Sequence, residues 1–418
     1  MKPPTAAQLR DRLGAAIGSR APLVEALCAS LQSSGEAGYL VGGPVRDLLL
    51  EQPVGDIDVL VPEHFERVAK ELAHRLDGRA IVRPRFRTAT VESSLGPVDL
   101  VGARSERYAR PGALPSVRAA RLDADLGRRD FSINCLAFAI YPEDGAVLDP
   151  EAGLADLRDM KLRALHPDSF VDDPTRMYRA ARFASRLGLQ FETRTRRWLR
   201  QALADDRVSL LSGARVLHEI VKLLDEENST RAVATTKRLA LFDAAVPGWL
   251  PSPPSAWRRW DRIKTAPPWP GAEASAEAGL ALLLAGSESR TQRRVLKRLG
   301  LTGRAATRPL EAARAARRYA RFLSALPSSG VLDARLADAS DETLVCLYCA
   351  LPAKSARLVA SFASDLKLRP NPVTGRDAAA LGLSGPQLGQ YLRAARRRVL
   401  DGKPLDRNWQ RRWLAARR

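Results

Sequence analysis

Residues 42–58 read GGPVRDLLLEQPVGDID, and they connect two short apolar runs that have the pattern of buried strands. The first run, residues 39–41, ends at Gly42 and Gly43, which lack a Cβ and therefore let a backbone approach a phosphate closely. The proline that follows suits the first turn of a helix, which we expect over residues 44–50. The amides at the start of that helix would point at the anion that the glycines hold.

Two carboxylates follow on the second run, which we expect to be a strand over residues 56–61. Asp56 and Asp58 are two positions apart, so both side chains leave the same face of that strand. Hard divalent cations prefer carboxylate oxygen, and two-metal sites hold ions roughly 3.5–4 Å apart for displacement at phosphorus. An Asp-x-Asp pair alone is more typical of an exposed strand face than of a metal site. Joined to a glycine strand end and a helix, it predicts a metal site for phosphoryl transfer.

A third carboxylate, Asp99, lies in an expected strand over residues 97–102. It is either a further metal ligand on a neighbouring strand or an ordinary aspartate on an edge strand. Residues 104–127, which come next, have few apolar positions and two prolines, and they predict a mobile loop that closes over substrate.

Two adjacent arginines, Arg128 and Arg129, precede an apolar segment that we interpret as a helix. Cations at a helix start are unfavourable unless they meet an anion, and the planar guanidinium fork suits the oxygens of a triphosphate. A surface cluster of ion pairs is the alternative.

Composition restricts the class of protein. The chain has 418 residues, enough for roughly two to four domains, with 45% hydrophobic and 27% charged residues. A formal net charge of +20 favours polyanionic partners, although an arginine-rich proteome would also produce it. No apolar run approaches the length of a membrane span, and four cysteines do not form a disulfide framework. We therefore expect a cytoplasmic protein with no membrane contact.

These motifs resemble the signature of the class II tRNA nucleotidyltransferase (CCA-adding enzyme) and bacterial poly(A) polymerase family. The resemblance implies that Asp56 and Asp58 hold two Mg²⁺ ions. Residues 128–135 are similar to the family motif Arg-Arg-Asp-Phe-Thr-Ile-Asn-Ala, with serine and cysteine in place of its threonine and alanine. The residues that the resemblance assigns to the triphosphate and ribose are Gly42, Gly43, Arg46, Arg128, Arg129, Asp130 and Asn134.

Residues 172–176 resemble the family motif Glu-Asp-x-x-Arg, with an aspartate in place of the glutamate. The resemblance implies that Asp173 and Arg176 read the incoming base, and that Arg179 and Arg182 reach the phosphates. Cytosine and adenine each present an amino donor beside a ring acceptor, which a carboxylate and a guanidinium can satisfy. The alternative is that Asp173 only caps a helix and that the arginines are solvated.

The fold class that follows is α+β, with a polymerase-β-like nucleotidyltransferase head built on a small mixed sheet and an all-helical neck, body and tail. We expect the head over residues 1–150, the neck with the base template over 151–245, a proline-rich connection over 246–286 and a basic helical body and tail over 287–418. The last segment would hold the RNA.

The predicted function is template-independent addition of C and/or A to the 3′ end of tRNA from CTP and ATP. The implied partners are the tRNA acceptor arm and nucleoside triphosphates, with no obligate protein partner. A poly(A) polymerase of the same family and a catalytically inactive RNA-binding protein on the same fold are the alternatives.

Overall fold

The computed structural model describes residues 6–113, 115–142 and 147–416, and the chain divides into two compact units, Met1–Leu211 and Ser212–Arg418. The division between the units falls inside the predicted neck, residues 151–245. The boundaries predicted from the sequence at residues 150, 245 and 286 stay predictions.

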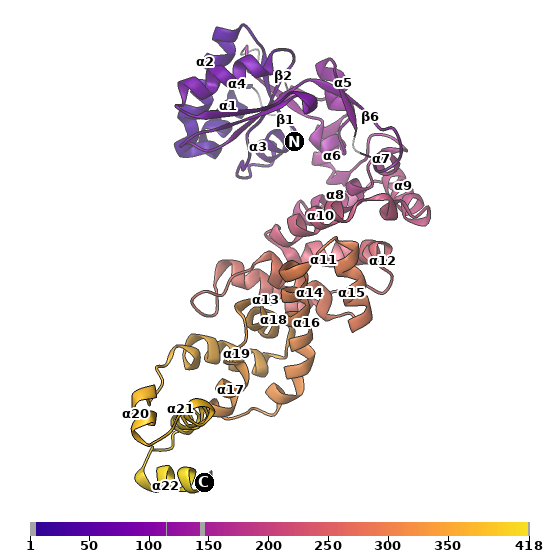
Figure 1. The fold of residues 1–418 in the computed structure, drawn as a ribbon. Coiled ribbons are helices and arrows are strands. Elements are labelled where there is room, and N and C mark those ends of the chain that lie inside the picture. The colour runs from indigo at the N-terminus through magenta and orange to yellow at the C-terminus, as the bar shows by residue number, and fades with distance from the viewer. Residues whose placement is uncertain (1–5, 114, 143–146, 417–418) are drawn as a thin grey trace. The chain divides into compact units, whose positions relative to one another are not determined.

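A mixed sheet, seven-stranded in the described residues, forms the centre of the first unit in the order β3-β4-β5-β2-β1-β8-β9 (Figure 1). β2 and β5 run parallel, and every other neighbouring pair in this sheet is antiparallel. The strands are β1 Gly38–Val41, β2 Asp58–Val61, β3 Arg79–Arg83, β4 Thr88–Glu92, β5 Val98–Gly102, β8 Ala137–Tyr141 and β9 Val147–Leu148.

One face of this sheet is covered by helices α2 (Ala21–Ser34) and α4 (Phe65–Arg75) (Figure 1). Val59 of β2 and its register partner Leu100 of β5 lie on this face, and both are fully buried. Side chains alternate between the two faces along a strand, so Asp58 and Leu60 belong to the opposite face.

The opposite face packs against helix α5 (Leu122–Gly127). Leu60, Leu126 and Ala137 are members of one buried apolar cluster there. Because Asp58 precedes Leu60 by two positions, its carboxylate lies on the same face, beyond the edge of this cluster. The pleat of the sheet therefore separates the carboxylate side from the side that α2 and α4 cover.

The remaining elements of the first unit surround this core. The expected helix over residues 44–50 is α3 (Gly43–Leu49). The other elements, in chain order, are α1 Ala6–Ile17, η1 Gly18–Arg20, η2 Pro84–Phe86, η3 Ser132–Asn134, α6 Gly153–Arg158, α7 Ser169–Asp172, α8 Thr175–Arg186, α9 Thr193–Ala204 and η4 Arg207–Leu210.

The prediction of a loop over residues 104–127 was wrong, and its predicted closure over substrate stays a prediction. Within this range β6 (Arg104–Arg107) and β7 (Ser116–Ala119) form an antiparallel hairpin, followed by α5. The hairpin has few apolar residues, and partly buried polar contacts connect it to the rest of the unit. Glu106 is one of these contacts and accepts a hydrogen bond from Arg128 at 2.6 Å.

The prediction of a helix after Arg129 was also wrong, because the apolar segment forms strand β8. A short apolar run fits a buried strand and a helix equally, and pairing with β1 selected the strand. Arg128 instead follows the last turn of α5, where the helix dipole favours a cation.

The second unit consists of helices in its described residues, so the predicted class of a mixed-sheet head and a mainly helical remainder is confirmed. One difference is a two-stranded parallel pair in residues predicted to be helical, β10 (Lys161–Leu162) with β11 (Gln190–Phe191). The elements of the second unit are α10 Gly213–Asp225, α11 Ser229–Arg238, α12 Leu241–Ala245, α13 Pro254–Thr265, α14 Ala276–Ala285, α15 Ser289–Arg298, α16 Gly303–Ser324, α17 Ser329–Leu336, α18 Asp341–Ala350, α19 Ala353–Ser364, η5 Leu366–Leu368, α20 Gly375–Ala380, α21 Gly385–Leu400 and α22 Arg407–Ala415.

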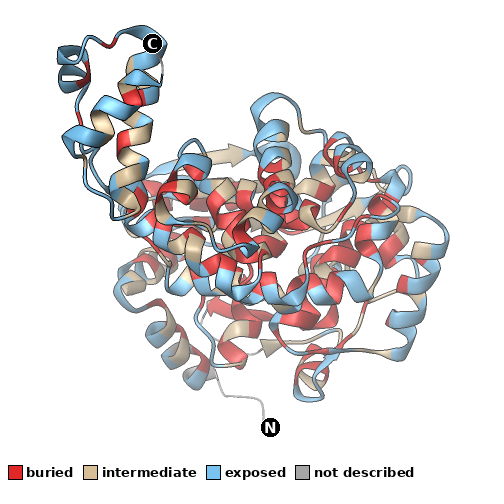
Figure 2. Cartoon of the chain, turned by 90° about the horizontal axis from the view of Figure 1, so that it is seen from below, coloured by how far each residue is buried: buried red, intermediate tan, exposed pale blue. Residues whose placement is uncertain are grey.

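The C-terminal helices α20–α22 have a small apolar core of their own. Tyr391 and Trp413 are buried in it, with ring centroids 5.1 Å apart and edge to face. Figure 2 shows few buried residues in this segment compared with the rest of the chain. No helix in the described part of the chain is both long and apolar enough to cross a membrane.

A substitution at Gly153 would test how closely α6 packs against the η3 turn. A Cβ at this position would lie well inside van der Waals contact with the carbonyl oxygen of Ser132, whereas a Cβ at Gly14 of α1 would meet nothing within 4 Å. We expect Gly153→Ala to lower the free energy of unfolding by about 1–3 kcal/mol. The control Gly14→Ala should raise it by roughly 0.5–1 kcal/mol, because alanine is the better helix residue. Urea unfolding of the full chain measures both, and equal stability of the two variants would contradict the packing.

Candidate active site

The turn after β1 brings an arginine against the backbone. Gly42 has φ 73° and ψ −122°, a conformation that glycine adopts without strain. A Cβ there would lie 2.6 Å from the nearer Nη atom of Arg129 and 3.5 Å from the carbonyl oxygen of Asn134. The backbone conformation therefore favours glycine at position 42, and any side chain there would displace the end of the Arg129 side chain. Its neighbour Gly43 begins α3 and is partly exposed.

Three carboxylates lie at the same end of the parallel pair β2–β5. Asp58 is the first residue of β2 and stands in register with Asp99 of β5. Asp56 precedes the strand, two positions from Asp58, with the buried Ile57 between them. The expected strand therefore begins at residue 58, and Asp56 is an exposed residue at its entrance.

The pKa of Asp58 is raised to about 6. Burial is the largest cause, the charges of Asp99 and Asp56 add to it, and the nearby Arg129 opposes it. Repulsion among the three carboxylates shows that they lie close enough to interact. Asp99 also accepts a hydrogen bond from the Thr90 hydroxyl at 2.7 Å.

This donor set fits a hard divalent cation. Carboxylate oxygens are the ligands that Mg²⁺ prefers, and a cation would relieve the repulsion that raises the pKa of Asp58. Among the described residues no group of three or more His, Cys, Asp or Glu side chains lies close enough to form a complete metal cage. Mg²⁺ is usually held by one or two carboxylates plus water and substrate phosphates, so two aspartates satisfy that requirement.

A buried carboxylate that the sequence analysis did not single out holds the two adjacent arginines. Asp125 of α5 is fully buried and accepts hydrogen bonds from Arg128 at 2.6 Å and from Arg129 at 3.1 Å. The spacing of three and four residues is that of neighbours on a helix face, and this was the available signal. The Nε atom of Arg129 is buried and has no hydrogen-bond partner among the described residues.

Asp130 and Asn134 form a buried polar bridge. Asn134 accepts a hydrogen bond from Arg46 at 2.7 Å and donates one to Asp130 at 2.9 Å. Asp130 in turn pairs with Arg179, whose Nε and Nη2 donate at 2.7 and 2.6 Å. Burial would raise the pKa of Asp130, but the Arg179 guanidinium and the Asn134 amide together hold it below the usual value.

Arg46 is almost completely buried, and its guanidinium nitrogens donate hydrogen bonds to other side chains of the protein. Its Nε donates to Asp47 at 2.8 Å, besides the bond to Asn134. The structure therefore places Arg46, Asp130 and Asn134 in one internal network. Their assignment to the triphosphate and ribose stays a prediction.

The expected base-reading pair lies at the start of helix α8. Asp173 precedes the helix by two residues, and its carboxylate accepts hydrogen bonds from the backbone N–H and the hydroxyl of Thr175, the first residue of α8. Arg176 is buried and donates to Ser169 at 2.8 Å and to the carbonyl oxygen of Arg128 at 2.9 Å. The last contact joins α8 directly to the arginine pair. Arg182, on the same helix, is also buried.

The β6–β7 hairpin reaches the same region. The Tyr108 hydroxyl donates to Glu106 at 2.9 Å, and Glu106 also binds Arg128. Burial and the Glu106 charge raise the pKa of Tyr108, while the charge of Arg176 lowers it, so the hydroxyl lies near that guanidinium. Sequence reasoning missed Glu106 and Tyr108 as contacts because it treated this segment as a loop.

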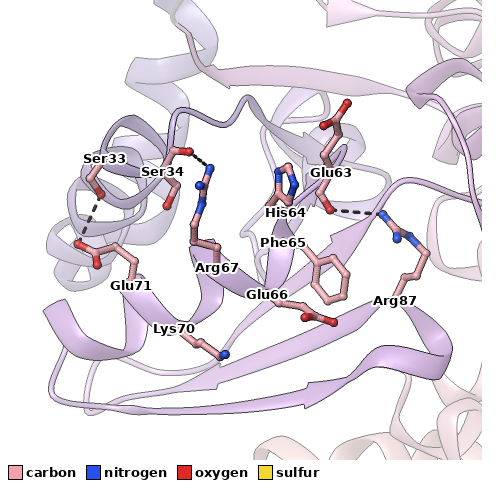
Figure 3. Close-up of a pocket in the computed structure, with 10 residues that line it drawn as sticks. All are labelled: Ser33, Ser34, Glu63, His64, Phe65, Glu66, Arg67, Lys70, Glu71 and Arg87. Atoms are coloured by element: carbon pink, nitrogen blue, oxygen red, sulfur yellow. Dashed lines mark hydrogen bonds between the residues drawn. The ribbon is translucent and has the colours of Figure 1, made fainter.

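A surface pocket of about 690 Å³ lies elsewhere in the first unit (Figure 3). Residues of α2 and α4 line it, so it is on the face of the sheet opposite the carboxylates. Its charged residues are balanced in sign and are Glu63, Glu66, Glu71, Arg67, Lys70 and Arg87. A pocket without net charge is a poor site for a triphosphate.

Comparisons with known proteins agree with this geometry. Residues 38–163 match the model of the Poly A polymerase head domain. The chain is 37% identical over 212 residues to an A-adding tRNA nucleotidyltransferase of Aquifex aeolicus, covering 50% of this chain and 26% of that protein. It is 42% identical over 153 residues to a CC-adding tRNA nucleotidyltransferase of Deinococcus radiodurans, covering 36% of this chain and 41% of the relative. The chain thus spans half or less of the curated relatives it matches.

A solved structure of a CCA-adding enzyme in an apo form superposes with a TM-score of 0.81 at 26% identity, over 95% of both chains. The sheet, the paired carboxylates and the glycine turn define a nucleotidyltransferase head domain. The likeness to solved structures extends over nearly the whole chain. The chain is therefore similar to class II tRNA nucleotidyltransferases and their poly(A) polymerase relatives, and residues 38–163 match the head domain that they share.

The raised pKa of Asp58 predicts how stability depends on pH. A carboxyl whose pKa is raised in the folded state stabilises the fold when protonated, fully below about pH 4, and this contribution is lost as pH rises through about 6. Without divalent cations at pH 7, Asp58→Asn should therefore unfold with a free energy about 2 kcal/mol above wild type. The difference should shrink toward pH 4.

Denaturant unfolding between pH 4 and 7.5 measures this dependence. The control Asp123→Asn changes an exposed carboxylate on α5 and should follow the wild-type curve. Added Mg²⁺ should raise the melting temperature of wild type and of the control but not that of Asp58→Asn. Identical pH dependence in Asp58→Asn and wild type would contradict the assignment.

Proposed function

We propose that the protein adds C and/or A nucleotides to the 3′ end of tRNA, without a template, from CTP and ATP, and releases pyrophosphate. The observation that carries this proposal is a continuous set of contacts in the first unit. Arg129 lies against Gly42 and near Asp58, and it shares the Asp125 carboxylate with Arg128. Arg176 of α8 donates to the backbone of Arg128. Metal-binding carboxylates, phosphate-binding arginines and base-reading groups thus adjoin one another.

Asp56 and Asp58 would hold two Mg²⁺ ions. Asp99 stands in register with Asp58 on the neighbouring strand, and its role as a further ligand stays open. When bound, these ions help to activate the terminal 3′-OH and neutralise the charge that develops on the transferred phosphoryl group. The burial and repulsion that raise the pKa of Asp58 support this role, because a cation would remove the repulsion.

Arg129 is the best-supported contact to the triphosphate. Its buried Nε finds no hydrogen-bond partner in the part of the chain that the structure describes. This donor and its position beside Gly42 suit an anion at the glycine turn. The other proposed contacts to the triphosphate and ribose are Gly43, Arg46, Arg128, Asp130, Asn134, Arg179 and Arg182. Several of these already hold one another, so their contribution would be to keep the positive groups in place.

Asp173 and Arg176 would read the base. A carboxylate accepts from the amino group of cytosine or adenine, and a guanidinium donates to the adjacent ring nitrogen. Guanine and uracil would leave buried groups unpaired, at roughly 1–3 kcal/mol each. The fixed position of Arg176, which Ser169 and the backbone of Arg128 hold, supports this selection.

The RNA would be bound mainly through its backbone and shape by the arginine-rich helices of the second unit. The net charge of +20 and basic helices such as α15 and α16 support such a partner. Because its proposed substrates are tRNA and nucleoside triphosphates, we place the enzyme in the cytoplasm. Poly(A) synthesis is a second candidate, since the matching head-domain model carries that name.

Incorporation of labelled nucleotides separates the candidate activities. The protein is incubated with tRNAs that end before CCA, after CC, or complete, together with CTP or ATP. Addition that stops after CCA, CC or a single A supports tRNA end synthesis of that kind, whereas long A tracts support poly(A) synthesis. No incorporation on any tRNA would favour a binding protein without catalytic activity.

Asp56→Ala and Asp58→Ala should each lower the rate of incorporation by at least about 10³-fold, because the metal stabilises transition-state charge by several kcal/mol. Binding of tRNA should be unchanged, as measured by gel shift. The control Asp123→Ala removes an exposed carboxylate of the same unit and should keep wild-type rates. Incorporation that survives the double change would eliminate these aspartates as metal ligands.

Asp173→Asn should reduce discrimination against GTP and UTP by roughly 10–100-fold, because the carboxylate acceptor is replaced by an amide that can also donate. The measured quantity is the ratio of kcat/KM for ATP or CTP to that for GTP or UTP. The neighbouring Asp172→Asn is the matched control and should leave the ratio unchanged. Equal ratios in wild type and Asp173→Asn would refute the base-reading role.

A further inference from the structure

One aromatic ring of helix α8 has three guanidinium groups around it. The Cζ atoms of Arg179 and Arg186 lie 5.4 and 5.9 Å from the centroid of the Phe183 ring. They come from the same helix, four residues before and three after the phenylalanine, which is the spacing of neighbours on one face. The third, Arg46 of α3, lies at 5.2 Å. Phe183 therefore joins the helix that carries the proposed base-reading pair to the glycine turn of the head.

The ring itself is fixed by packing. Phe183 is 8% exposed, and it meets the fully buried Phe131 edge to face, with centroids 5.9 Å apart and an interplanar angle of 81°. Phe131 follows directly after Asp130, so the motif that supplies the buried polar bridge also supplies the edge contact. Edge-to-face pairs of this kind restrict the orientation of both rings.

Arg46 and Arg179 are connected twice. At their polar edges, Asn134 accepts from Arg46, and it donates to Asp130, which pairs with Arg179. At their faces, both guanidinium groups contact the Phe183 ring. These contacts form a ring of five neighbouring side chains: Arg46, Asn134, Asp130, Arg179 and Phe183. Phe183 is the apolar member of this ring.

Electrostatics gives the Phe183 ring a specific role among these five side chains. Asp47 and Asp130 each neutralise one of the two guanidinium groups along an edge. The electron-rich face of an aromatic ring attracts a cation, and it covers the planar surface that the carboxylates do not reach. An aliphatic side chain in its place would fill space but leave the angle of each guanidinium plane unrestrained.

We propose that Phe183 is a positioning residue for nucleotide binding, which acts by fixing the Arg179 guanidinium against Arg46. The side chain of Arg179 is about one-third exposed, at 32%, so a substrate phosphate can reach it. This inference rests on the proposed function, since it assumes that the arginines of α8 meet the triphosphate of an incoming nucleotide.

The test compares Phe183→Leu, which removes the aromatic face, with Phe183→Tyr, which keeps it. Phe65→Leu is the matched control, because Phe65 is also buried and has Arg87 over its ring at 5.5 Å, on the other side of the sheet. The full chain is used throughout. The readouts are KM and kcat for ATP and CTP, the melting temperature, and the rise in melting temperature on adding ATP.

We expect Phe183→Leu to raise KM for the preferred nucleotide about tenfold with kcat within about threefold of wild type. Phe183→Tyr should stay within about threefold of wild type in both constants, and Phe65→Leu should lower only the melting temperature. A purely structural role for Phe183 would change the melting temperature without changing KM.

Three results would overturn the proposal: a wild-type KM in Phe183→Leu, a change no larger than that in Phe65→Leu, or equal changes in the leucine and tyrosine variants. If wild type incorporates no nucleotide, the proposed function fails separately. The ATP-induced rise in melting temperature then decides the role of Phe183: its loss in Phe183→Leu alone supports the proposal. Absence of any rise in wild type, or equal rises in all variants, refutes it.

Discussion

Burial of like charges is the constraint that organises the first unit. Arg46 and Arg176 are almost fully buried, and isolated buried cations would be strongly destabilising. Arg46 pairs with Asp47. Two buried carboxylates serve the other arginines: Asp125 holds Arg128 and Arg129, and Asp130 holds Arg179 and lies near enough to Arg176 for their charges to interact. Removing either carboxylate would take a counter-charge away from guanidinium groups in a poorly hydrated region. The positive groups are therefore fixed before any nucleotide binds, so binding need not order them.

The sheet determines where the negative groups lie. Pairing of β2 with β5 sets Asp58 opposite Asp99, and the pleat directs both away from the helices α2 and α4. A shift of register by one residue would turn these carboxylates into the apolar core and expose Val59. The core packing of the head thus enforces the geometry of the proposed metal site. The same packing holds the carboxylates close together despite their mutual repulsion, which contributes to the raised pKa of Asp58.

Contacts between segments that are distant in the sequence assemble the site. Residues near 42, 130 and 180 are far apart in the chain, and they meet through Gly42–Arg129, Asn134–Arg46 and Arg128–Arg176 contacts. The β6–β7 hairpin joins the same network through Glu106. Movement of the hairpin would therefore shift the side chain of Arg128. It would also shift Arg176, which donates to the backbone of Arg128. Phe183 adds an apolar contact to a network that is otherwise polar.

Local patterns in the sequence were sufficient for the glycine turn, the helix after it and the paired aspartates, because each depends on residues within a few positions. The alternation of short strands and helices also predicted a mixed sheet, but not the order in which its strands pair. Local patterns did not reveal that residues 104–107 pair with 116–119, or that the segment after Arg129 becomes a strand, since long-range pairing decided both. Nor did they identify Asp125, Glu106 or Phe183, whose importance lies in partners brought from other elements. Which charges are neutralised, and by which group, depends on distances between elements, and only the folded chain sets those distances.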